Sequence, residues 1–454
     1  MGVDKKEAGI DVSKYDMKRM TIMSIPIFIE LFLQMLVGNI DQIMISRYSE
    51  GAVAAIGNSN QIMNILIIFL NVMGSGTTIV LARYLGAGNK KKVAETCTAS
   101  LFMMGILGIL AGFIVVALHT PIFRAMNIPD EVLPDASKYM SIIGICIVVQ
   151  ALYMTLGAIL RAYSMNGVIT AISFIMNIMN VIGNAILIYG LFGMPKLGIA
   201  GVAISTNISK CAGLIIMILF FCWKVKIKVS IKYLRPLPIE TIKKIMQVAI
   251  PSGAEGISYN ISQMVILGVI NTFGTYVINT KVYASMIANV AYIYSIAIAQ
   301  ALQVVIGYLV GAGRKELVNR KVWMVQVVAT VVSVSLSIIV YFNSDILFRL
   351  FTNDERVLAL AHKVMLVEIF LEIGRSVNIV MVKALIAAGD VKYPVVCGII
   401  FQWLVAALFS YILGSICGLG LVGVWIAMAM DECIRGLMFV IRFKSEKWKQ
   451  MKVT

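Results

Sequence analysis

Ionisable side chains inside long apolar runs are the first candidates for chemistry in this sequence. The candidates are Glu30, Asp41, Glu255, Glu368, Glu372, Arg375, Asp431, Glu432 and Arg435. A charged group at the centre of a lipid bilayer costs at least about 2.5–3.5 kcal/mol, so such groups usually serve a function or pair with one another. Carboxylates at this depth can bind and release a proton or a cation, or attract a cationic ligand.

Asp41 shares its expected depth with three neutral oxygen-bearing side chains. Counted along the apolar runs at about 1.5 Å per residue, it lies in the outer third of a membrane. Asn180 and Asn184, one helical turn apart, and Thr206 fall at the same depth. A carboxylate surrounded by amide and hydroxyl oxygens suits a proton or a hard cation such as Na⁺. We therefore predict an ion site at these four residues, with no other metal site in the chain.

A second set of acids is expected nearer the middle of the membrane. Glu30 and Glu255 each follow a proline by four residues, where a kink can turn a carboxylate inward. Glu368 and Glu372 share their run with Arg375, and we expect that arginine to pair with one of them. This leaves Glu30 and Glu255 as the carboxylates without a counter-charge. Asp431, Glu432 and Arg435 are expected to form a local ion network.

Amides at helical spacing form a polar stripe in two of the runs. Asn64 belongs to the first stripe, and Asn289 with Tyr292 belongs to the corresponding part of the chain further on. Such amides either hold two helices together or line a binding cleft. The chain also has 28 Met, and this flexible side chain suits sites that accept varied ligands.

The elements that carry these residues are long and apolar. The chain of 454 residues is 60% hydrophobic and only 14% charged, with a mean hydropathy of +0.90. Since a membrane-spanning helix needs about 20 apolar residues, the sequence predicts twelve spans. They are 20–46, 53–81, 93–118, 133–160, 166–190, 197–222, 243–270, 277–309, 318–342, 357–382, 394–416 and 419–440. This excludes a soluble enzyme and a receptor with a large domain outside the membrane.

The basic residues predict the orientation in the membrane. Of the 39 Lys and Arg, 28 lie on the side of the termini, eight on the opposite side and three within spans. Because basic loops stay in the cytoplasm, both termini are expected there, in a multi-pass protein of the cell membrane. The net charge of +16 then faces anionic lipid and requires no nucleic acid.

The chain repeats itself at a shift of 222 to 225 residues. The matching segments are 25–30 with 250–255, 84–88 with 308–313, 123–133 with 348–358, 161–167 with 383–389, and 197–202 with 419–424. We predict an all-α membrane protein of two six-helix repeats that form two lobes around a central cleft, as in transporters built from repeats. The expected parts are an N-terminal lobe (1–222), a basic cytoplasmic linker (223–242), a C-terminal lobe (243–442) and a basic tail (443–454).

These motifs resemble the multidrug and toxic compound extrusion (MATE) family. The resemblance rests on Pro-x-x-x-Glu in spans 1 and 7, Asn39-Ile40-Asp41 in span 1, and Gly-Ala-Gly with basic residues after spans 2 and 8. It implies that Asp41, Asn180, Asn184 and Thr206 match an N-lobe cation site, although this chain has Asn184 where one branch often has Asp. It also implies that Glu255 matches a C-lobe cation site, for which Glu368 or Glu372 supplies the second acid.

We therefore expect a monomeric secondary-active antiporter that exports hydrophobic, cationic organic molecules in exchange for H⁺ or Na⁺, without a cofactor. The alternative is a flippase for lipids or lipid-linked oligosaccharides of similar architecture, which needs a strongly cationic cleft for a pyrophosphate. A membrane-embedded enzyme is not expected, because both histidines lie near the predicted outer surface and no set of nucleophile and base is evident.

Overall fold

The computed structural model describes residues 15–46, 48–225, 227 and 229–451, without the side chains of residues 37–43 and 50. The described residues are almost entirely helical, which confirms the all-α prediction. They form two compact units. The N-terminal unit consists of residues 29–84 and 89–249, and the C-terminal unit of residues 15–28, 85–88 and 250–451.

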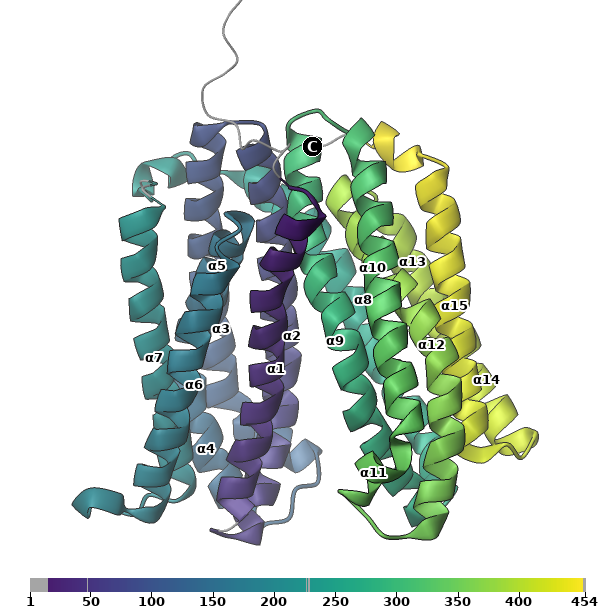
Figure 1. Ribbon diagram of the computed structural model, residues 1–454. Helices are drawn as coiled ribbons and strands as arrows, with labels where there is room; N and C mark the ends of the chain where they lie inside the picture. The colour runs from purple at the N-terminus through teal and green to yellow at the C-terminus, as the bar shows by residue number, and fades with distance from the viewer. Residues whose placement is uncertain (1–14, 47, 226, 228, 452–454) are drawn as a thin grey trace, which may run out of the picture. The chain divides into compact units, whose positions relative to one another are not determined.

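In the described chain, nine α-helices or helix segments lie before residue 312. Figure 1 labels them α1 to α9. They are α1 (Met17–Ser46), α2 (Glu50–Gly86), α3 (Lys90–Ala125), α4 (Leu133–Ile145), α5 (Ile147–Ala162), α6 (Asn166–Tyr189), α7 (Ile199–Lys224), α8 (Ile239–Asn271) and α9 (Thr275–Gly311). The short 3₁₀ turns η2 (Leu191–Gly193) and η3 (Ile231–Leu234) lie in the connections that flank α7.

The rest of the chain contains longer helices and several short segments. They are α10 (Glu316–Phe342), α11 (Ser344–Arg349), α12 (Glu355–Ala388), α13 (Lys392–Phe401), the π-helical turn η4 (Gln402–Ala407), α14 (Leu408–Tyr411), the π-helical turn η5 (Ile412–Ile416), α15 (Gly420–Lys444) and the 3₁₀ turn η6 (Lys447–Gln450).

The predicted spans all fall on helices of the described chain. Eight helices are long and apolar enough to cross a membrane, and α4 with α5 adds a ninth span that is bent by 49°. The other three spans fall on α8, α12 and α15, which have 33, 34 and 25 residues. Each of these is long enough to cross a bilayer at about 1.5 Å per residue. The intramembrane charges are concentrated on these three helices, so they are less apolar than the rest.

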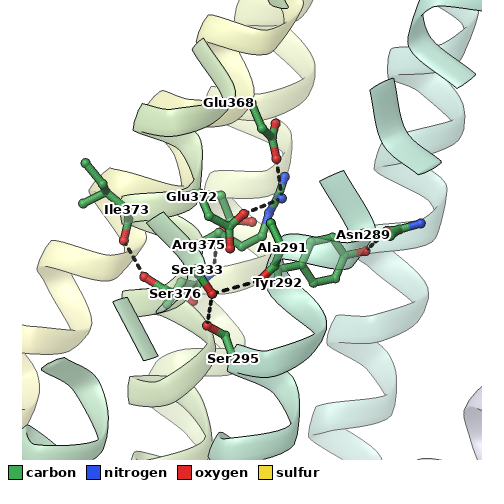
Figure 2. Close-up of polar contacts among 12 residues, drawn as sticks. Asn289, Ala291, Tyr292, Ser295, Ser333, Glu368, Glu372, Ile373, Arg375 and Ser376 are labelled. Atoms are coloured by element: carbon green, nitrogen blue, oxygen red, sulfur yellow. Dashed lines mark hydrogen bonds and ion pairs between the residues drawn. The ribbon is translucent and has the colours of Figure 1, made fainter. Parts of the chain in front are cut away.

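The N-terminal unit is held by an apolar core between α3, α4, α6 and α7. Phe123 of α3 and Met140 of α4 are fully buried in the same cluster as Ile188 of α6 and Ala203 of α7. In the C-terminal unit, α12 packs against α9, α10 and α15. Side-chain hydroxyls join these helices, since Ser295 of α9 and Ser333 of α10 lie 2.7 Å apart (Figure 2).

Two glycines show that the sequence repeat is also a structural repeat. A Cβ added at Gly201 would lie 2.7 Å from the carbonyl oxygen of Leu187, and one added at Gly423 would lie 2.6 Å from that of Leu413. Three residues earlier, the backbones of Gly198 and Gly420 have φ of +54° and +56°, which favours glycine. The last helix of each repeat, α7 or α15, therefore approaches the preceding helical segment closely at a matched glycine.

The repeats differ in where their helices are interrupted. The N-terminal unit is interrupted between α4 and α5 at Cys146, whereas the corresponding α12 is continuous. Conversely, α6 is continuous, whereas its counterpart α13 passes into the π-helical turn η4 at Gln402. Such π-turns occur often at functional sites, because they change the direction in which the following side chains point.

Candidate functional site: an ionisable cavity in the C-terminal unit

A cavity of about 400 Å³ lies among α8, α9, α12, α13 and α15 of the C-terminal unit. Its polar and charged lining consists of Glu255, Tyr259, Tyr292, Arg375, Asn378, Lys383, Glu432 and Arg435. Apolar side chains, among them Ile296, Val382 and Phe439, complete the wall. The volume lies within the roughly 300–1,000 Å³ that is usual for small-molecule sites.

Arg375 is the centre of one ion cluster at this cavity. Its Nη1 atom lies 2.8 Å from Glu368 Oε1 and 2.9 Å from Glu372 Oε2, and both glutamates are buried (Figure 2). The guanidinium also lies over the ring of Tyr292, 4.7 Å from the centroid. The indole of Trp425 donates a hydrogen bond of 2.7 Å to Glu368. The sequence predicted that Arg375 pairs with one of the two acids, and the structure shows that it binds both.

Arg435 forms a second ion cluster on α15. Its guanidinium lies 2.5 Å from Asp431 and 3.0 Å from Glu432, which confirms the predicted local network. Asn378 of α12 donates a hydrogen bond of 2.5 Å to Glu432 and so joins the two helices. A buried ion pair costs little when each partner keeps such bonds, and a great deal when one partner is removed.

Glu255 differs from the other acids of this cavity. Its Oε1 atom accepts a hydrogen bond of 2.8 Å from the side-chain amide of Gln402, the first residue of the π-turn η4. Among the described residues no cation lies within ion-pair distance of Glu255, although the charges of Arg435 and Lys383 act on it at longer range. A Cβ added at Gly398 would lie 3.1 Å from the Glu255 side chain, so a larger residue there would make that side chain shift by a few tenths of an ångström.

The charges around the cavity do not balance. The two clusters and Glu255 contribute five carboxylates, while Arg375, Lys383 and Arg435 contribute three cations. Three buried acceptor oxygens on residues of the ion clusters and their bonding partners also lack a hydrogen-bond donor in the described chain: Glu372 Oε1, Asn378 Oδ1 and Gln402 Oε1. Buried acceptors are normally satisfied, so the site has more carboxyl groups than basic groups and also spare oxygen ligands.

The structure brings three of the four residues of the predicted N-terminal ion site together. The side-chain amide of Asn180 donates to the Thr206 hydroxyl over 3.1 Å, and that of Asn184 donates to Asn180 Oδ1 over 3.5 Å. The Ser205 hydroxyl donates to the carbonyl oxygen of Asn180, which fixes α6 against α7. The side chain of Asp41 lies outside the described residues, so the complete site stays a prediction.

The expectation that Glu30 lacks a counter-charge is wrong. Arg161 binds both carboxylate oxygens of Glu30, at 3.3 and 3.4 Å, and the glutamate is buried. In the sequence repeat, Glu30 corresponds to Glu255 and Arg161 to Lys383. Each unit thus carries a glutamate and a basic residue at these two positions. They form an ion pair in the N-terminal unit, whereas in the C-terminal unit both line the cavity.

Of the two predicted polar stripes, only the second contributes a residue to this cavity in the described chain. Tyr292 and Asn289 bond to each other through their side chains, and Tyr292 lines the cavity (Figure 2). Asn64, on α2 of the N-terminal unit, is exposed. In the described part of the chain, no group of three His, Cys, Asp or Glu side chains could hold a metal ion.

Sequence reasoning missed four polar residues of this site, of which Tyr259 lies one turn of α8 beyond Glu255. Lys383 could have been found, because the repeat aligns it with Arg161. Asn378 lies one turn of α12 beyond Arg375, but it looks like any polar residue in a run. Gln402 carries no signal, because its contact with Glu255 depends on the π-turn.

Comparison with known proteins places the chain in a family. The MatE family model matches residues 26–186 and 251–412, one match in each half of the chain. The uncharacterized transporter YisQ of Bacillus subtilis (strain 168) is 35% identical over 425 residues, which cover 94% of this chain and 93% of YisQ. The probable multidrug resistance protein NorM of Thermotoga maritima is 25% identical, over 96% of this chain and 94% of that protein.

Solved structures share the fold. A multidrug resistance MATE family transporter in an outward-facing conformation superposes with a TM-score of 0.88 at 19% identity, over 98% of this chain and 99% of that chain. A MATE structure in complex with MaD3S gives a TM-score of 0.88 at 20% identity, over 97% and 99% of the two chains. With the family match and the relative at 35% identity, they show that the chain is a transporter of the MATE family.

Proposed function

We propose that this protein is a secondary-active antiporter that exports hydrophobic, cationic organic molecules in exchange for H⁺ or Na⁺. The observation that carries the proposal is Glu255, a carboxylate at a cavity of about 400 Å³ that has no ion-pair partner among the described residues. Relatives named as probable multidrug resistance proteins support multidrug efflux as the class of transport.

The contrast between Glu255 and the other acids supports a role in ion exchange. Glu368, Glu372 and Asp431 are held by arginine, so a proton or cation that binds them must compete with a fixed guanidinium. Glu255 is held only by an amide, which can donate to a carboxylate and accept from a carboxylic acid after it turns. Glu255 is therefore the acid that can most easily gain and lose a proton or Na⁺.

The excess of carboxylates supports a cationic substrate. With five acids against three bases, the neighbourhood of the cavity favours positive charge, and low-dielectric walls strengthen that preference. The aromatic rings of Tyr259 and Tyr292 add surfaces on which organic cations can lie. The same excess gives no support to the alternative flippase, which must hold a pyrophosphate.

Ion binding drives transport when the two conformations of the carrier bind the ion with different affinity. We propose that Glu255 and the Asp41, Asn180, Asn184 and Thr206 site bind the coupling ion, and that Glu255 also attracts substrate. The protein is then a monomer in the cell membrane with both termini in the cytoplasm, and it needs no cofactor.

The test is transport in proteoliposomes that contain a cationic dye. A pH jump and a Na⁺ jump are applied separately to the same vesicles, and dye movement is followed by fluorescence. We expect one of the two gradients to drive efflux and the matching ionophore to abolish it. Dye movement at the same rate with and without both gradients contradicts antiport.

A further inference from the structure

A second cavity lies at the basic end of the N-terminal unit, outside the spans. Its volume is about 790 Å³, and it is formed by the start of α3, by η3 and by the segment that leads into α8. Its charged lining consists of Lys91, Lys92, Glu95, Lys232, Arg235 and Glu240. Because η3 packs against α3, residues more than 130 positions apart in sequence share one pocket.

The two acids of this pocket already have partners. Glu95 binds Lys92 Nζ at 2.8 Å and accepts a hydrogen bond of 2.5 Å from the Thr241 hydroxyl. Glu240 binds Lys244 Nζ at 2.6 Å, and this hydrogen bond keeps the pKa of the Glu240 carboxyl below its ordinary value. In the described chain Lys91, Lys232 and Arg235 have no acidic partner, so three positive charges remain for a ligand.

Two long helices begin at the same pocket. Helix α3, of 36 residues, begins at Lys90, and the side chain of Asn89 accepts a hydrogen bond only from the backbone N–H of Lys92. Helix α8, of 33 residues, begins at Ile239 directly after Pro238. The start of a helix carries partial positive charge and free N–H groups, which favour a phosphate oxygen.

Leu237 and Ile239 line the basic pocket, Ile231 stands between its lining residues Ser230 and Lys232, and Trp223 lies at the end of the helix that precedes this segment. Ile231, Leu237 and Ile239 are 72%, 54% and 70% exposed, although they adjoin the charged lining. Trp223, at the end of α7, is 66% exposed, and Lys224 lies over its ring at 4.2 Å. Exposed aliphatic and Trp side chains beside Lys and Arg are typical of the region where lipid headgroups meet acyl chains. A free anion in water does not require such a rim.

We propose that this pocket binds the phosphate of an anionic phospholipid, whose acyl chains lie against Ile231, Leu237 and Ile239. Lys91, Lys232 and Arg235 neutralise the headgroup, and the first turns of α3 and α8 contribute N–H donors. The lipid anchors the connection between α7 and α8 to the membrane on the side that the basic residues predict to be cytoplasmic. This site is separate from the ion and substrate sites of the proposed function.

The test is native mass spectrometry of the full-length protein with phosphatidylglycerol or phosphatidylcholine. The variant K91Q/K232Q/R235Q removes the unpaired charges of the pocket. The matched control R314Q/R320Q/K392Q removes three exposed charges from the same predicted side of the C-terminal unit. We expect wild type to retain phosphatidylglycerol over phosphatidylcholine, the pocket variant to lose at least about tenfold in affinity, and the control to keep it.

A second variant and a soluble anion test the lipid assignment. L237Q/I239Q keeps every charge but removes part of the apolar rim, so it should weaken phosphatidylglycerol binding without affecting inorganic phosphate. The proposal is overturned if the control triple variant loses as much affinity as the pocket variant. It is also overturned if inorganic phosphate displaces phosphatidylglycerol at equal concentration.

Discussion

At the scale of single residues, one pair of repeat positions has two different environments. Glu30 forms an ion pair with Arg161. Glu255 instead lines a cavity, as does Lys383, and accepts a hydrogen bond from Gln402. The sequence predicted the position of both acids, because a charge in an apolar run is easily recognised. It could not predict their difference, which depends on the side-chain contacts of Gln402.

Gly398→Ala tests whether dye binding depends on the exact position of the Glu255 side chain. The new methyl group would lie 3.1 Å from Glu255 Cγ and 3.3 Å from its Oε1 atom, so the Glu255 side chain must shift by a few tenths of an ångström, which strains its hydrogen bond with Gln402. We expect the affinity for a cationic dye to fall about tenfold, which corresponds to about 1.4 kcal/mol. Dye binding to the purified variant, measured by fluorescence anisotropy, gives the result.

Gly268→Ala is the matched control, because it changes the same residue type on the helix that carries Glu255. A Cβ at Gly268 meets nothing within 4 Å, so dye affinity should stay at the wild-type value. Helix stability should stay equal or rise, since Ala is the better helix former. Unchanged affinity in Gly398→Ala would show that the site does not depend on the position of Glu255.

At the scale of elements, hydrophobic length predicted the helices well and their interruptions poorly. The predicted spans 133–160 and 394–416 each lie on a helical segment, yet the first is bent by 49° and the second contains two π-turns. Neither interruption has a proline within it. No proline therefore marks either interruption in its apolar run.

The ion cluster of α15 allows a prediction about stability. Removing the charge by Arg435→Met leaves the buried Asp431 and the partly buried Glu432 without their counter-charge, which should lower the free energy of unfolding by roughly 3–5 kcal/mol. Thermal unfolding in detergent, followed by tryptophan fluorescence, measures the loss. Arg349→Met is the control, because its pair with Glu355 is exposed and should contribute little. Equal losses of unfolding free energy in both variants would mean that the buried α15 cluster contributes no more to stability than an exposed ion pair.

At the scale of the whole molecule, the repeat is the feature that sequence predicted best. The matched glycines Gly201 and Gly423 each approach a backbone carbonyl group of the preceding helical segment, and the MatE family match also falls once in each half. The N-terminal ion site is the part that remains least complete, because the side chain of Asp41 lies outside the described residues.

The orientation in the membrane follows from the distribution of basic residues and can be measured directly. Single cysteines at positions 91 and 447 should react only with reagents that reach the cytoplasm, whereas cysteines at 130 and 354 should react from outside. These positions lie on opposite sides of the predicted spans. They are introduced into a variant without the seven native cysteines, whose transport is checked first. Labelling of position 447 from outside in intact cells would reverse the orientation.

The central claim is that an intramembrane carboxylate couples ion binding to export, and Glu255→Gln tests it most directly. Gln keeps the size and the hydrogen bond to Gln402 but can neither release a proton nor bind Na⁺ as an anion. Dye binding and gradient-driven transport are measured on the same purified protein, with Asp41→Asn in parallel for the N-terminal site and the exposed Glu355→Gln as control. We predict that Glu255→Gln folds but loses gradient-driven transport, while Glu355→Gln retains it. Full gradient-driven transport by Glu255→Gln would contradict the account.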